Sequence, residues 1–279
     1  MSVIIGIDVG GSTTKIVGYT DKEKWIGMLK VEAADPQTSA YGALGKFVNE
    51  HGLALTDVKQ IILTGVGASL FKKKVYGIPT STVDEFKAIG LGGLALSGKK
   101  EGLIVSMGTG TAFVRAGKKG IFHIGGSGVG GGTVVGLGSQ LCGVKSFRNL
   151  VALAEKGKLH KVDLNIGDIS TKAISNLAKE ITASNFGKME DGLEPADLAA
   201  GVLNMVFQTI GMMAVFACRN EAMKDVVLTG TLSQVPGAEK VFKMLHNMHG
   251  IHFIIPKNAI YATATGAALS YLYQKEKKK

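Results

Sequence analysis

Gly6-Ile7-Asp8-Val9-Gly10-Gly11-Ser12-Thr13-Thr14-Lys15 is the stretch that decides the fold. It joins two strand-like runs, Val3 to Val9 and Lys15 to Tyr19, and its glycines predict a hairpin turn between them. A carboxylate at the end of a buried strand, beside hydroxyls and turn N–H groups, suits Mg²⁺ and phosphate together. We therefore expect Asp8 to be the metal ligand. The expected phosphate contacts in the turn are Gly10, Gly11, Ser12 and Thr13.

An apolar strand that ends in a loop of Gly, Ser or Thr occurs four times, at residues 8, 65, 108 and 230. This weak internal repeat predicts an α/β fold of two related halves whose strand ends face a common cleft. The polar segment 99–102 marks the expected crossing, so we assign residues 1–100 and 101–279 to the two halves. The second half is expected to supply a second phosphate loop that clamps the nucleotide opposite the hairpin: Gly108, Thr109, Gly110 and Thr111.

The remaining elements follow from apolar periodicity and turn residues. Helices are predicted at 40–50, after the cap-like Thr80-Ser81-Thr82, at 133–141 and at 263–274, and strands at 60–64, 103–107, 226–230 and 251–255. The chain between residue 142 and residue 225 is predicted to be mostly helical. Its longest apolar stretch, Val202 to Cys218, contains polar side chains and is short for a membrane span, which favours a buried core helix.

The densest glycine cluster lies at residues 125–132. Gly126, Gly128 and Gly131 have the spacing of a dinucleotide fingerprint, but that motif needs an acidic residue about 20 positions later on the next strand. The nearest acid downstream is Glu155, inside an apparent helix, and a Gly-Lys-Ser/Thr P-loop string is also missing. A glycine loop that leads into a helix start still offers N–H groups to phosphate. The candidate ligands are Gly128, Gly130, Gly131 and Gly132.

Asp84 and Glu85 lie in the first turn of the helix after Thr82. A positioned carboxylate can accept the proton of an attacking hydroxyl, so either residue is a candidate general base. Two acids at a helix N-terminus are equally well explained by a favourable interaction with the helix dipole. The residues alone leave both interpretations open.

Composition narrows the class of partner. The formal net charge is +10, but the lysines form short separate runs at 72–74, 99–100, 118–119 and 277–279 without interleaved aromatics, which favours solvated turns over a nucleic-acid surface. Cys142 and Cys218 are the two cysteines and have no metal-ligand spacing. We expect a cytoplasmic protein that binds neither nucleic acid nor membrane.

Together these strings resemble the actin/hexokinase/sugar-kinase superfamily, and within it the type II pantothenate kinases. Gly6–Lys15 is similar to the first phosphate hairpin of that family, Val83–Phe86 to its catalytic segment and Gly108–Thr111 to its second phosphate loop. Gly125–Leu137 resembles its nucleotide-binding glycine loop, and Ala183–Gly187 resembles a further family segment.

The resemblance implies two ribonuclease-H-like halves around a nucleotide cleft, in an ATP- and Mg²⁺-dependent enzyme. Glu85 would be the general base, Asp8 would hold Mg²⁺ through water, and Lys15 would lie near the phosphates. Gly230 and Gly266 would be nucleoside-pocket glycines. The family implies a homodimer that converts pantothenate to 4'-phosphopantothenate, the first step of coenzyme A biosynthesis.

Two residues on the expected acceptor side depart from the family pattern. Ala112 follows the second phosphate loop where the family tends to have a small hydroxyl residue. His123 replaces an Arg that would bind the pantothenate carboxylate, and Arg115 is the candidate substitute. With Thr109, these residues form the expected substrate-binding set.

Two alternatives therefore stay open at this point. One is a kinase of the same architecture for another alcohol, such as pantetheine or a sugar. The other is an ATPase switch that activates a partner enzyme, although such activators carry cysteines for an iron–sulfur cluster and only Cys142 and Cys218 are present.

Overall fold

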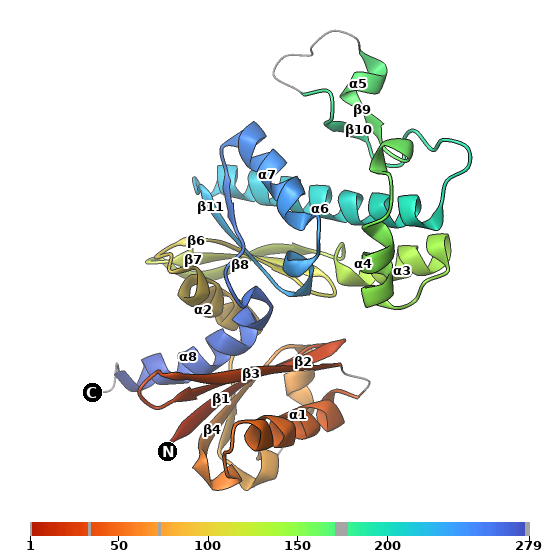
Figure 1. The fold of residues 1–279 in the computed structure, drawn as a ribbon. Coiled ribbons are helices and arrows are strands. Elements are labelled where there is room, and N and C mark those ends of the chain that lie inside the picture. Colours follow the sequence, from red (N-terminus) through yellow and green to blue (C-terminus); the bar gives the residue numbers. More distant parts are fainter. Residues whose placement is uncertain (1, 33–34, 72–73, 171–177, 277–279) are drawn as a thin grey trace.

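The chain folds around two five-stranded sheets. A computed structural model describes residues 2–32, 35–71, 74–170 and 178–276, and Figure 1 shows one sheet above the other. The first sheet has the strand order β3-β2-β1-β4-β5. Its strands are β1 (Val3–Val9), β2 (Thr13–Thr20), β3 (Trp25–Glu32), β4 (Val58–Thr64) and β5 (Thr80–Thr82). The predicted hairpin is confirmed, because β1 pairs with β2 antiparallel and Asp8 lies opposite Lys15.

The second sheet repeats the topology of the first. Its order, β12-β11-β6-β7-β8, places a three-strand antiparallel meander beside two parallel strands, as in the first sheet. The strands are β6 (Gly102–Met107), β7 (Thr111–Gly117), β8 (Gly120–Ser127), β11 (Asp225–Thr229) and β12 (His252–Ile254). The prediction of two related α/β halves is confirmed.

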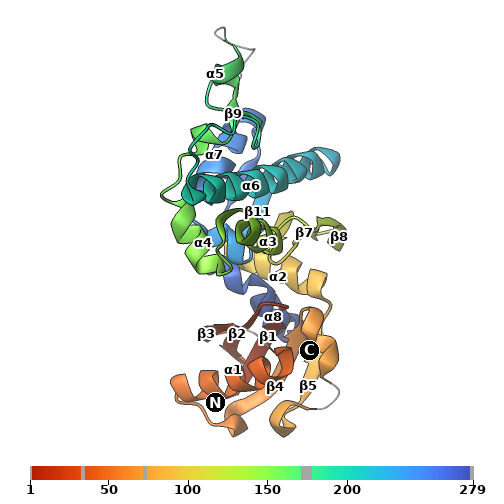
Figure 2. The same ribbon diagram turned by 90° about the vertical axis from the view of Figure 1, so that its right-hand side faces the viewer.

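Two helices cross between the sheets, and each packs on the sheet of the other half (Figure 2). The helix α2 (Glu85–Ser97) packs through Ile89 on the second sheet, and α8 (Ala262–Glu276) packs on the first sheet. A Cβ at Gly92 would overlap the carbonyl oxygen of Ala262, and one at Gly266 would overlap that of Ala88. Gly266 is therefore a helix-packing residue, and its place in a nucleoside pocket stays a prediction. The division of the chain at residue 100 stays a prediction. The C-terminal helix α8 belongs to the second half by sequence but packs on the first sheet.

The outer faces of both sheets are covered by helices that form the main cores. α1 (Pro36–Glu50), capped by Asp35, covers the first sheet. The second sheet is covered by α6 (Pro195–Asn220), against which α3 (Gly131–Cys142), α4 (Phe147–Ala154) and α7 (Ala238–His249) pack. Among the described residues α6 is the one helix long and apolar enough to cross a membrane, but 61% of its apolar window is buried. This burial supports the predicted core helix.

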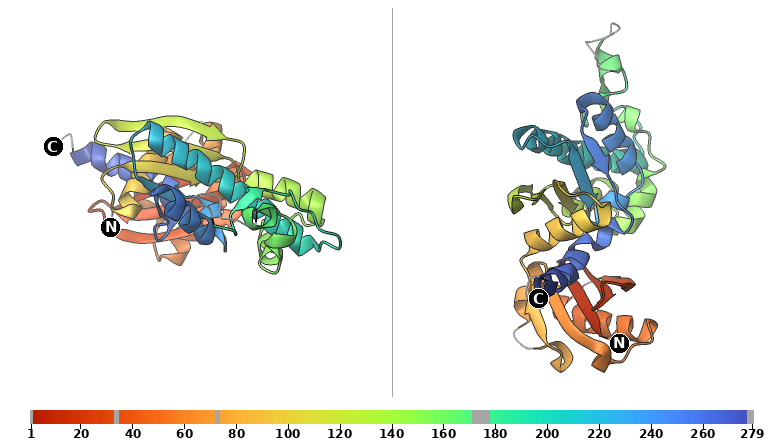
Figure 3. Two further views of the ribbon diagram at one scale, coloured as in Figure 1. Left: turned by 90° about the horizontal axis from the view of Figure 1, so that it is seen from above. Right: turned by 90° about the vertical axis from the view of Figure 1, so that its left-hand side faces the viewer.

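The segment between α4 and α6 projects from the second half (Figure 3). It contains β9 (Leu164–Asn165), α5 (Ile166–Ile169) and β10 (Thr182–Ser184), so the predicted mostly helical connection is wrong here. The buried Asp163 anchors it by accepting hydrogen bonds from the Asn185 side chain, the Phe186 N–H and the Asn204 side chain. The 3₁₀ helices within the described residues are η1 (Leu55–Asp57), η2 (Val66–Leu70), η3 (Val75–Gly77), η4 (Leu159–Lys161), η5 (Thr231–Gln234) and η6 (Ala259–Tyr261).

The predicted lysine turn at 72–74 is only partly within the described residues, and the lysine tail at 277–279 is wholly outside them. Lys72 and Lys73 are the residues of that turn that the structure does not describe.

Candidate active site at the facing strand ends

Three polar side chains gather at the ends of β1, β2 and β4. Asp8, Lys15 and Thr64 are in register with one another and are all at least nine-tenths buried. The Lys15 Nζ lies 3.4 Å from the Asp8 Oδ2, so the two charges form a buried ion pair. The Thr64 hydroxyl has no hydrogen-bond partner within the part of the chain that the structure describes. A buried hydroxyl without a partner next to a carboxylate is a polar group that a bound water or ion could satisfy.

Thr64 is the site residue that the sequence analysis missed. Its signal is the repeated Leu-Thr-Gly string, which closes β4 at residues 63–65 and β11 at residues 228–230. Gly65 and Gly230 adopt the same left-handed backbone, with φ of 87° and 85°. A Cβ at Gly65 would lie 2.7 Å from the Asp8 Oδ1, and one at Gly230 would lie 2.5 Å from the carbonyl oxygen of Met107. Both positions thus require glycine, for conformation and for space.

The two predicted phosphate loops meet across the cleft. The Ser12 Oγ and the Thr109 Oγ1 are 3.2 Å apart and share a hydrogen bond between residues 97 positions apart in the chain. The hairpin turn is closed by a bond from the Gly10 N–H to the carbonyl oxygen of Thr13. Gly11 and Ser12 are exposed at its tip. The structure therefore brings the two loops together from opposite halves, as a phosphate clamp requires.

The glycine loop before α3 contacts the second phosphate loop through its backbone. The N–H groups of Gly131 and Gly132 donate to the carbonyl oxygens of Gly108 and Thr109, each at 2.8 Å. A Cβ at Gly130 would lie 2.6 Å from the same Thr109 oxygen. These glycines are needed because two backbone segments touch, so the two N–H groups are not free for phosphate in this arrangement. Gly128–Gly132 shape the cleft by holding the loop 108–110.

Hydroxyl groups fix the same pair of loops. The Thr111 Oγ1 donates to the carbonyl oxygen of Val129 at 2.8 Å, so its side chain serves the loop and does not face a ligand. The Thr133 Oγ1 donates to the carbonyl oxygen of Gly128.

The structure separates the roles of Asp84 and Glu85. Asp84 is the N-cap of α2, where its carboxylate accepts the Lys87 N–H at 2.9 Å. Glu85 is the first helical residue and half-buried. Burial raises the pKa of Glu85, the negative charges of Asp8 and Asp84 raise it further, and Lys15 partly opposes them. Glu85 therefore lies within electrostatic reach of the Asp8–Lys15 pair, which suits a general base.

His123 and Arg115 are on opposite faces of the second sheet. His123 stacks on Phe86, the residue after Glu85, with ring centroids 3.8 Å apart and planes 9° from parallel. Arg115 forms an ion pair with Glu221, at 3.2 Å, on the face that α6 covers. Ala112 packs on the α2 side with the cluster that contains Phe86. Arg115 is therefore not brought to the acceptor side, and the prediction that it substitutes there is wrong.

The donor set near Asp8 fits Mg²⁺ bound together with phosphates. The described residues contain no group of three or more His, Cys, Asp or Glu side chains that could hold a metal by themselves. Mg²⁺ is commonly held by one or two carboxylates, waters and substrate phosphates. One buried carboxylate beside the partnerless Thr64 hydroxyl matches that pattern.

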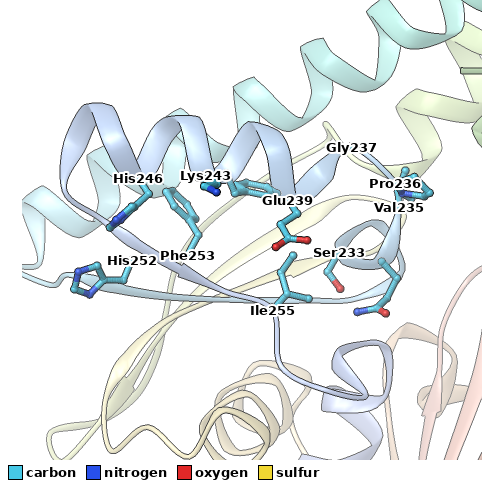
Figure 4. A pocket seen from close by; sticks show the side chains of 12 residues that line it. Ser233, Val235, Pro236, Gly237, Glu239, Lys243, His246, His252, Phe253 and Ile255 are labelled. Atoms are coloured by element: carbon cyan, nitrogen blue, oxygen red, sulfur yellow. The ribbon is translucent and has the colours of Figure 1, made fainter. Parts of the chain in front are cut away.

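A cavity of about 720 Å³ lies beneath α7, beside η5 and β12 (Figure 4). Its lining includes Ser233, Glu239, Lys243, His246 and His252, and it contains neither Asp8 nor Glu85. Ser233 links it to the Gly230 turn, since its Oγ donates to the Gly230 carbonyl at 2.7 Å. The cavity is therefore distinct from the carboxylate cluster.

Comparisons with known proteins agree with this geometry. The family model described as Fumble matches residues 102–252. A type II pantothenate kinase from Bacillus cereus is 27% identical over 241 residues, covering 83% of this chain and 84% of the relative. One from Oceanobacillus iheyensis is 28% identical over 281 residues, covering 95% and 98%. The resemblance to this family is confirmed.

Solved structures show the fold. The activator of the 2-hydroxyisocaproyl-CoA dehydratase from Clostridium difficile with bound ADPNP has a TM-score of 0.71 at 16% identity, covering 99% of this chain and 98% of its own. The ROK hexokinase from Thermus thermophilus has a TM-score of 0.59 at 14% identity, covering 98% and 99%. Both likenesses support two ribonuclease-H-like halves around a cleft.

Proposed function

The chain belongs to the Fumble family, and from this premise we propose that it transfers the γ-phosphoryl group of ATP to the hydroxyl of pantothenate, the first step of coenzyme A biosynthesis. The observation that carries the proposal is the meeting of the Ser12 and Thr109 loops beside a cluster of Asp8, Lys15 and Glu85. Phosphoryl transfer depends mainly on positioning and charge stabilisation, and this arrangement supplies both. The relatives of similar length named type II pantothenate kinase support pantothenate as the acceptor.

Each residue of the cluster has a defined task in this mechanism. Asp8 would hold Mg²⁺, and the ion would supply positive charge next to the phosphates when bound. Lys15 lies beside Asp8 and stabilises the transferred group. Glu85 accepts the proton of the acceptor hydroxyl as that oxygen attacks. The hairpin 10–13 and the loop 108–111 orient the triphosphate, and Gly230 with the glycine loop shapes the nucleoside end.

The acceptor side is assigned to Thr109, Ala112 and His123. His123 is exposed and stacks on Phe86, which is the residue that follows the proposed base Glu85 in α2. A histidine presents one N–H to a carboxylate, where an arginine presents a two-pronged fork, and it is shorter. We propose that it contacts the pantothenate carboxylate. We also propose that the protein is cytoplasmic and forms a homodimer.

The test is a coupled ADP-release assay with Mg²⁺ over pantothenate, pantetheine, a hexose and no acceptor. The proposal requires the highest kcat/KM with pantothenate. A preference for pantetheine or the hexose would keep the kinase and refute the acceptor. Equal ADP release without any acceptor would favour an ATPase switch, the activity class suggested by the dehydratase activators that share the fold.

A further inference from the structure

Lys30 extends the row of charged side chains at the candidate site by one strand. In the ladders of the first sheet, Asp8 lies opposite Lys15, and Lys15 lies opposite Lys30 on β3. Side chains directly opposite each other on adjacent strands project from the same face of a sheet. Asp8, Lys15 and Lys30 therefore stand side by side on three strands that are spaced by about 4.8 Å.

The alternation along β3 fixes the face on which Lys30 lies. Leu29 and Val31, its two neighbours in sequence, pack in the core that α1 covers. Successive side chains of a strand point to opposite faces, so Lys30 points away from α1. The opposite face is the one on which α8 packs, through Val17 among others, two residues after Lys15. Lys30 and Lys15 therefore share the face that is turned toward the second half.

Lys30 brings a positive charge that no side chain neutralises. Asp8 and Lys15 form an ion pair, whereas Lys30 has no ion pair within the part of the chain that the structure describes. Partial burial lowers the pKa of Lys30, the charge of Lys15 lowers it further, and Glu32 on the same face partly opposes both. Like charges directly opposite each other destabilise a sheet, so a bound anion would relieve the repulsion between Lys15 and Lys30. The Lys30 side chain is exposed, which leaves it open to a ligand.

Glu85 lies at the other end of this row. It follows β5, and β5 and β3 are the two opposite edges of the first sheet. Of the two lysines, Lys15 lowers the pKa of Glu85 and Lys30 does not affect it. In phosphoryl transfer the attacking and leaving oxygens lie roughly in line, on opposite sides of the phosphorus. An acceptor hydroxyl that attacks from the Glu85 end therefore places the leaving oxygen on the side of Lys30.

We propose that the Lys30 ammonium binds the β-phosphate of the nucleotide and stabilises the charge that develops there as the γ-phosphoryl group leaves. This rests on the proposed function and names a residue for its leaving-group side. The bond from the γ-phosphorus to the bridging oxygen breaks while the bond to the acceptor oxygen forms. ADP keeps the electron pair of the broken bond, Glu85 takes the acceptor proton, and Lys30 stays protonated. A fixed cation at the developing charge lowers the barrier.

Titration calorimetry with nucleotides in the presence of Mg²⁺ tests the contact without requiring turnover. ADP carries the β-phosphate and AMP lacks it, so the pair isolates this contact from the rest of the site. Lys30→Met removes the charge and is expected to weaken ADP binding by about 10–100-fold, the range for losing a hydrogen bond between charged groups. AMP binding should not change. Lys30→Arg keeps the positive charge and should retain most of the affinity for ADP.

Lys22→Met is the matched control, because it causes the same change in net charge at the other end of the β2–β3 hairpin. Lys22 is exposed and lies beyond Thr20, which is about 17 Å along β2 from Lys15. Its substitution should leave the affinity for both nucleotides unchanged. Circular dichroism melts show whether each variant folds, and Lys30→Gln provides a second neutral substitution if Lys30→Met does not.

Other results would overturn the assignment of Lys30. Wild-type affinity for ADP in the neutral variant would remove Lys30 from the nucleotide site. An equal loss for ADP and AMP would exclude a specific contact with the β-phosphate. A higher KM for pantothenate with unchanged ADP binding would place Lys30 on the acceptor side. These results would leave the kinase proposal standing, whereas a wild-type protein that binds no ADP would refute both.

Discussion

Replacing Glu85 by Gln removes the proposed proton acceptor while keeping the size of the side chain. Loss of a general base costs about 10²–10⁴-fold in rate, which corresponds to about 3–5 kcal/mol of transition-state stabilisation. We expect kcat to fall by this factor and the affinity for Mg²⁺–ATP to change little, since the phosphate loops are untouched. Single-turnover ADP release and titration calorimetry measure the two quantities.

The structure also gives the pH dependence of this residue. Burial and the charges of Asp8 and Asp84 raise the pKa of Glu85, so wild-type turnover should decline from a pH above the ordinary glutamate range as the solution is acidified. A carboxyl whose pKa is raised on folding costs stability as pH rises through that pKa, because the charged form is disfavoured in the folded state. Glu85→Gln should therefore melt higher than wild type at neutral pH, and this difference should disappear in acid.

Asp84→Asn is the control for Glu85→Gln. Asparagine is as good an N-cap as aspartate, so the helix start and turnover should be retained. Near-wild-type turnover in Glu85→Gln, or an equal loss in both variants, would remove Glu85 from the proposed role.

Five further substitutions probe the site and its supports. Asp8→Asn should abolish Mg²⁺-dependent turnover, and an unchanged metal-concentration profile would argue against Asp8 as the ligand. His123→Phe keeps the stack on Phe86 but removes the ring nitrogens, so KM should rise for pantothenate and not for uncharged pantetheine; equal changes for both acceptors would exclude the contact. Gly92→Ala should cost about 1–3 kcal/mol in urea unfolding because α2 and α8 touch there, whereas Gly42→Ala, with open space around it, should gain about 0.5–1 kcal/mol. Asp163→Ala removes the carboxylate that accepts from three N–H donors, one of them the buried Asn204 amide, and should cost about 2–3 kcal/mol in urea unfolding; a loss below about 1 kcal/mol would contradict the anchoring role of Asp163.

Local sequence patterns were sufficient to predict the two halves. The strands β1, β4, β6 and β11 are apolar runs that end in glycine, so both the elements and the shared cleft could be predicted. The exchange of α2 and α8 could not be predicted, because α8 is rich in alanine and its pattern does not say which sheet it covers. The contact at Gly92 and Gly266 appears only once both helices are placed.

The sequence was sufficient to predict which residue types form the candidate site. It was less informative about which partner each of these residues contacts. Asp8, Lys15, Ser12 and Thr109 are brought together as expected. Period-two alternation already places Arg115 on the face opposite Ala112, and its partner Glu221 lies too far along the chain to be inferred. The N–H groups of a glycine loop cannot be assigned to a ligand from sequence, because tertiary carbonyl oxygens compete for them, as they do at Gly131.

The most direct test of the central claim is to follow the γ-phosphoryl group itself. ATP labelled at the γ-position is incubated with Mg²⁺, the protein and pantothenate, and the labelled products are separated. The account predicts label on pantothenate in a one-to-one ratio with ADP, through the cleft between the Ser12 and Thr109 loops. ADP with label only in inorganic phosphate, or no ADP at all, would contradict it.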